Sequence, residues 1–128
     1  MSKKDELLKE WLKKAESDYQ TAELILKEKP ELTEPACFHC QQASEKYLKA
    51  LLIFYDIRFL KSHDLSYLLD LLSEKQEIPE NILNAAAELQ GYAVEIRYPD
   101  DFYSPDLEET KKAYEFMSII KTFVLEYL

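Results

Sequence analysis

Turn-forming residues are scarce in this 128-residue chain, and their positions constrain its fold more than any other feature of the sequence. The chain contains one glycine, and its five prolines are at positions 30, 35, 79, 99 and 105. All five prolines lie outside the segments in which apolar residues recur every three or four positions, which is the spacing of one helix face. Because proline breaks helix interiors, the pattern predicts long helices joined by short, proline-marked connections.

These periodic segments predict five helices. We expect them at residues 4 to about 29, about 33 to 56, about 62 to 75, 79 to about 96, and from 104 onward. The second is the most apolar and is expected at the centre, because it can bury side chains against several neighbours. No segment alternates as a strand does. The predicted fold is an all-α, antiparallel up-and-down bundle of four long helices and one short helix, with residues 1–128 forming one domain.

The helix ends carry further signals. Thr33 is the expected N-cap of the second helix, Ser62 or Asp64 of the third, and Ser104 of the fifth, because their side chains can accept a hydrogen bond from a free backbone N–H. Gly91 interrupts the pattern of the fourth helix. It indicates either close packing or a bend.

The charge of the chain limits its binding partners. The formal net charge is -9, and the excess lies in the second half, where 13 acidic residues accompany 5 basic ones. This balance argues against a dedicated DNA-binding protein, while a local RNA groove remains compatible with it. Lys46, Lys49, Arg58 and Lys61 are close in sequence and form either a positive strip or a set of separately solvated cations. No apolar run approaches the ~18 residues of a membrane span, and the N-terminus is charged, so we expect a cytoplasmic protein.

Polar side chains in the apolar second helix are the main functional signal. Helical spacing places His39, Gln42 and Lys46 on one stripe, and Gln42, Glu45 and Lys49 on an adjoining one. The stripe is either a ligand or partner surface, or a solvated face with a Glu45–Lys49 ion pair. His39 has two interpretations, a hydrogen-bonded core residue or a base.

The block from Phe38 to Leu52, with His63-Asp64-Leu65 and Arg97-Tyr98-Pro99-Asp100, resembles the HEPN domain family of small helical proteins. In many HEPN ribonucleases a histidine follows the motif arginine by four to six residues. Here no histidine follows Arg97, and both histidines of the chain precede it. The resemblance therefore implies the non-nucleolytic branch, commonly encoded beside a minimal nucleotidyltransferase, in which the domain is a non-catalytic partner that holds a nucleotide or polyanionic substrate.

Arg97 has two interpretations. It can form an ion pair with Asp100 or Asp101 that fixes the loop, or it can contact a phosphate or an acidic partner. Tyr98 and Tyr103 either pack there or stack on a base. No residue is assigned a catalytic role, and the expected ligand- or partner-binding residues are His39, Gln42, Glu45, Lys46, Lys49, Arg97, Tyr98 and Asp100.

Several alternatives stay open. A ribonuclease of unusual composition could combine Arg97 with His39 or His63 as the base. The chain could also be an antitoxin-like or structural interaction subunit. Nine tyrosines and six phenylalanines provide aromatic area for a partner, and a homodimer is the simplest expectation. Cys37 and Cys40 have C-x-x-C spacing but no second cysteine pair, so we interpret them as core residues and expect neither a metal nor a cofactor.

Overall fold

The computed structural model describes residues 2–94 and 103–128, and this part of the chain contains helices and no strands. The α-helices are α1 (Lys3–Glu28), α2 (Thr33–Phe54), α3 (Leu65–Leu72), α4 (Glu80–Leu89) and α5 (Leu107–Tyr127), and a short 3-10 helix, η1, spans Gln90–Tyr92. The all-α prediction is confirmed. No helix in the described ranges is long and apolar enough to cross a membrane.

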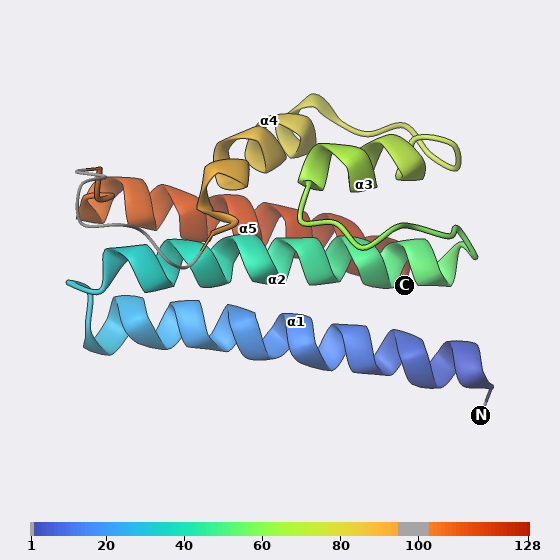
Figure 1. The fold of residues 1–128 in the computed structure, drawn as a ribbon, viewed down its shortest axis with the longest axis horizontal. Helices are drawn as coiled ribbons and strands as arrows, with labels where there is room; N and C mark the ends of the chain where they lie inside the picture. Colours follow the sequence, from blue (N-terminus) through green and yellow to red (C-terminus); the bar gives the residue numbers. More distant parts are fainter. Residues whose placement is uncertain (1, 95–102) are drawn as a thin grey trace.

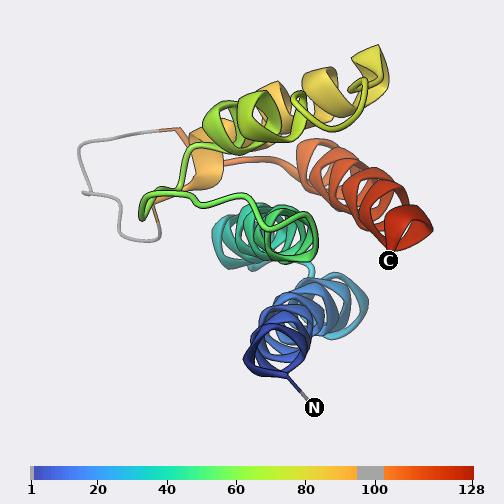
Figure 2. The ribbon, with the colours of Figure 1, turned by 90° about the vertical axis from the view of Figure 1, so that its right-hand side faces the viewer.

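Helix α2 lies at the centre of the bundle, as predicted. It contacts α1, α3, α4 and α5, and Figures 1 and 2 show α1 on one side of it and the other helices on the opposite side. The cause is its composition, because α2 supplies many of the fully buried large side chains, including Tyr47, Leu48, Leu51 and Leu52. The polar stripe predicted on α2 is therefore carried by the central helix of the bundle.

The up-and-down order breaks between α2 and α3, which run in the same direction in Figure 1. In Figure 1, α1 and α2 run antiparallel, and so do α4 and α5, whereas α2 and α5 run in the same direction. The reason is the extended segment at residues 57–64, which turns back along α2 before α3 begins. This return path brings the segment over one face of α2, where it takes part in the candidate site.

The fourth helix is shorter than predicted. It was expected to reach about residue 96, but α4 ends at Leu89 and η1 follows, so three helices are long and two are short. Gly91 lies in η1, and a Cβ atom added there would meet nothing within 4 Å. Close packing at this glycine is therefore wrong. The change from α to 3-10 geometry is consistent with the low helix propensity of glycine.

The observed caps differ from two of the three predictions. At α3 the Asp64 side chain accepts a hydrogen bond from Tyr67 N (3.3 Å), so one of the two predicted caps is confirmed. At α2 the N-cap is Leu32, without a side-chain bond, and Thr33 is already helical. At α5 the Asp106 carboxylate accepts from Glu109 N (2.8 Å), so this helix begins later than expected from Ser104.

Replacing Asp64 tests how much its cap stabilises the fold. We expect Asp64→Ala to lower the free energy of unfolding by about 1 kcal/mol, because an N–H in the first turn of α3 loses its acceptor. Urea denaturation measures the change. Asp70→Ala, which removes an exposed acid from the same helix, is the control and should stay within about 0.5 kcal/mol of wild type. Equal losses in both variants would contradict a capping role.

Candidate functional site

The first part of the stripe lies at the junction of α1 and α2. Asp18 of α1 accepts from both predicted residues that face it: one oxygen is 2.8 Å from His39 Nδ1 and the other is 2.5 Å from Lys46 Nζ. The Asp18 side chain is 12% exposed, and those of His39 and Lys46 are 25% and 22% exposed. The buried Asp18 carboxylate therefore holds both partners in place, and His39 is a hydrogen-bonded residue at the edge of the core.

The protonation of Asp18 is coupled to this cluster. Burial acts to raise the pKa of Asp18, but hydrogen bonds from His39 and Lys46, together with their charges, outweigh burial and hold it below its ordinary value. A carboxyl whose pKa is lower in the folded state stabilises the fold above its unfolded pKa near 4, and this contribution disappears as the pH falls through the folded pKa. The cluster therefore stabilises the α1–α2 junction at neutral pH and weakens in acid.

The acid sensitivity of this junction can be measured. We expect Asp18→Asn to be less stable than wild type at pH 7, and the difference to shrink as the pH falls below about 4, the ordinary pKa of Asp, and then through the lower pKa of the folded carboxyl. Chemical denaturation at a series of pH values gives the two stability curves. A difference that stays constant from pH 7 to pH 2 would show that the charge of Asp18 contributes nothing.

The second part of the stripe is buried beneath the 57–64 segment. Glu45 and Lys49 form an ion pair of 2.8 Å, with side chains 3% and 8% exposed, and the other Glu45 oxygen lies 2.8 Å from His63 Nδ1. The Lys49 ammonium also lies over the rings of Trp11 (5.2 Å) and Phe59 (5.8 Å). The predicted Glu45–Lys49 pair is thus present, but its interpretation as part of a solvated face is wrong, because the folded-back segment and α1 cover it.

Two glutamines fix the segment to the bundle. Gln41 Nε2 and Gln90 Nε2 donate to the His63 carbonyl, at 3.0 and 3.1 Å, and Gln42 Nε2 donates to Gln41 Oε1 at 2.8 Å. His63 is thereby held through its backbone and through its ring, although its side chain is 68% exposed. This geometry supports a loop-bracing role for His63 and Asp64. It also places Gln42 beside the brace, where it is half-buried.

The predicted positive strip does not form as one surface. Lys46 and Lys49 are each paired with a carboxylate inside the cluster. Arg58 and Lys61 are exposed, and neither has an ion-pair partner within residues 2–94 and 103–128. Two of the four cations are therefore neutralised locally, so the four do not act as one strip.

Sequence reasoning missed Asp18 and Trp11, which complete the two clusters from α1. Both lie on the α1 face that meets α2, seven residues apart, and this spacing is the signal that could have connected them.

Arg97, Tyr98, Asp100 and Asp101 lie outside the described residues, and their roles stay predictions. Cys37 and Cys40 are buried and are not joined by a disulfide. In the described ranges no group of three or more His, Cys, Asp or Glu side chains could hold a metal ion.

Part of the tyrosine content is used inside the bundle, where α1 meets α5. Tyr19 Oη lies 3.0 Å from Tyr114 Oη and 3.1 Å from Ser118 Oγ, and the Lys121 ammonium is 4.0 Å from the centre of the Tyr19 ring. Tyr47 of α2 donates to Glu16, and burial together with this carboxylate raises the pKa of Tyr47. These rings tie helices together, so they are not surplus area for a partner.

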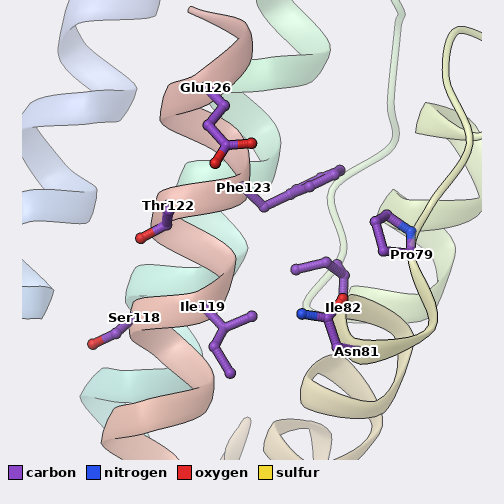
Figure 3. Close-up of a pocket in the computed structure, with 8 residues that line it drawn as sticks. All are labelled: Pro79, Asn81, Ile82, Ser118, Ile119, Thr122, Phe123 and Glu126. Carbon is purple, nitrogen blue, oxygen red and sulfur yellow. The ribbon is translucent and has the colours of Figure 1, made fainter.

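A surface pocket lies between α4 and α5, away from the stripe. Its volume is about 400 Å³, and Figure 3 shows Ile82, Ile119 and Phe123 around it. Glu126 is the one ionisable residue in its lining, and none of the predicted site residues belongs to it. A single carboxylate provides no acid–base pair, so the candidate functional site stays at the α2 stripe.

The chain belongs to the HEPN domain family, because the family model matches residues 8–127. Three solved structures support this: an archaeal HEPN homologue (28% identity, TM-score 0.75, covering 94% of this chain and 96% of that one), a Thermus thermophilus protein (29%, 0.74, 94% and 98%) and a HEPN domain protein from Thermotoga maritima (25%, 0.75, 92% and 96%). No curated protein matches the chain. The family and fold expected from the sequence are thus confirmed.

Proposed function

We propose that this chain is a HEPN-type binding module that acts as the non-catalytic partner of a nucleotidyltransferase. One observation carries the proposal: the ionisable side chains of the α2 stripe are each fixed by a polar partner. Asp18 pairs with His39 and Lys46, and Glu45 pairs with Lys49 and His63. The members that reach solvent, His39, Lys46 and above all His63, are thereby held in fixed positions, which suits them to recognition.

The same geometry limits how a nucleotide is held. Lys46 and Lys49 are already neutralised by carboxylates, so a phosphate would have to displace an existing ion pair to reach them. We therefore propose that a nucleotide or other polyanion is held jointly with the partner, and that the isolated chain binds it weakly.

Two titrations test this function. Calorimetry of the purified chain against the minimal nucleotidyltransferase of the same genome should show saturable binding. ATP should give heat with the complex and little with the chain alone. Absence of binding to the nucleotidyltransferase, with or without ATP, would remove the proposal.

A second function is supported by the exposure of His63. Its Nδ1 is fixed by the buried Glu45 carboxylate while most of the ring is open to solvent, an arrangement that can position a general base. His39 is mostly covered and hydrogen-bonded to Asp18, so His63 is the better candidate for the ribonuclease alternative. Cleavage of an oligoribonucleotide by wild type, lost in His63→Ala but not in His39→Ala, would favour this alternative. An inactive, folded wild type would remove it.

A further inference from the structure

The end of the bundle where α1 begins and α2 ends carries a second surface. A pocket of about 570 Å³ lies there, lined by side chains from α1, from α2 and from the start of the 57–64 segment: Lys4, Leu7, Ile53, Asp56, Ile57, Arg58 and Phe59. Leu7, in the lining, is 46% exposed, and Leu60, which directly follows the lining residue Phe59 in the chain, is 75% exposed, so both present apolar area to solvent. None of the α2 stripe residues lines this pocket.

The pocket has an unbalanced positive charge. Lys4 is neutralised, because its ammonium lies 3.0 Å from Asp56 Oδ2. Arg58 has no ion-pair partner in the part of the chain that the structure describes, and neither has the exposed Lys61. No acidic residue lies between Ile57 and Lys61, in a chain whose net charge is -9. A local positive site on an acidic protein attracts an anionic partner and repels a cationic one.

The segment that carries these cations is held in an extended form. Ile57 N donates to Leu52 O (2.9 Å) and Leu60 N donates to Tyr67 Oη (3.0 Å). Phe59 packs against the Trp11 ring, with ring centroids 6.2 Å apart. Ile57 and Phe59 are half-buried, whereas Arg58 and Leu60 are exposed, so alternate side chains point outward from a fixed backbone. Little ordering is needed when a partner binds.

From these observations we propose a docking surface for a segment of the partner protein that carries both acidic and aliphatic side chains. The surface is formed by Arg58, Leu60 and Lys61, with Leu7. Guanidinium and ammonium groups pair with carboxylates, while Leu7 and Leu60 cover aliphatic side chains. The exposed apolar area favours a polypeptide over a nucleic-acid backbone. This inference rests on the proposed function, since it specifies where the nucleotidyltransferase binds.

Placing negative charge on the surface tests the inference. The nucleotidyltransferase should bind Arg58→Glu and Leu60→Asp at least about tenfold more weakly than it binds wild type. Its affinity for wild type should also fall as the salt concentration rises. The matched control is Lys13→Glu, which makes the same kind of charge change at an exposed position of α1. Both test positions are exposed, and thermal melts of the variants establish that they fold.

The outcomes separate the two proposals. If the nucleotidyltransferase binds wild type, Arg58→Glu, Leu60→Asp and Lys13→Glu with equal affinity, the docking surface is overturned and the proposed function stays intact. No wild-type binding would remove the proposed function and this inference together. If Arg58→Glu abolishes self-association of the chain, the surface binds a second copy. If a single-stranded oligoribonucleotide competes for the surface, it binds RNA. Either result would also overturn the inference.

Discussion

Replacing Glu45 with alanine is expected to lower the free energy of unfolding by about 3–5 kcal/mol, because it leaves the buried Lys49 ammonium without its carboxylate. The Glu45 and Lys49 side chains are 3% and 8% exposed, so water cannot take the place of the lost partner without opening the structure. The substitution also releases the His63 ring, which Glu45 holds through Nδ1. Urea denaturation followed by circular dichroism measures the loss.

A double variant separates the charge effect from simple loss of packing. Glu45→Leu combined with Lys49→Met removes both charges and keeps apolar volume, and it should lie much closer to wild type than Glu45→Ala does. If Glu45→Ala costs less than about 1 kcal/mol, the pair is effectively solvated. The description of a buried, pre-organised stripe would then be wrong.

Replacing Leu48 with alanine is the second substitution with a large expected effect. Leu48 is fully buried in α2, the helix that contacts all the others, and we expect a loss of about 2–5 kcal/mol in the free energy of unfolding. The loss combines the transfer free energy of the removed methyl groups with the cavity left behind. Denaturation midpoints in urea, together with an unchanged slope, measure it.

Leu60→Ala is the matched control for Leu48→Ala, since it makes the same chemical change at a side chain that is 75% exposed. Its stability should stay within about 0.5 kcal/mol of wild type. Similar losses at Leu48 and Leu60 would show that α2 is not the centre of the core.

The helices were predictable because apolar periodicity is a property of the sequence alone. The central place of α2 followed from its composition. The end of α4 was not predictable, because residues 90 to 96 keep enough apolar character to extend a helix pattern although Gly91 weakens it. The return of the 57–64 segment along α2 depends on the bonds from Gln41 and Gln90 to the His63 carbonyl, and neither bond leaves a periodic signal.

The candidate site was predictable on α2 and not beyond it. Spacing placed Glu45 and Lys49 together, and the structure confirms their contact. Their burial was missed, because it requires knowing that Trp11 and Phe59 come from two other parts of the chain to cover Lys49. Asp18 was missed for the same reason. Ion pairs between helices depend on how two helices are aligned against each other, and this alignment cannot be read from the spacing of residues within one helix.

Calorimetric titration of the purified nucleotidyltransferase into the wild-type chain tests the central claim most directly, with an oligoribonucleotide incubated in the same preparation as an internal check. If the chain is a recognition module, the heat of binding should saturate as the nucleotidyltransferase is added, and the RNA should stay intact. A flat titration accompanied by RNA cleavage that depends on His63 would contradict it.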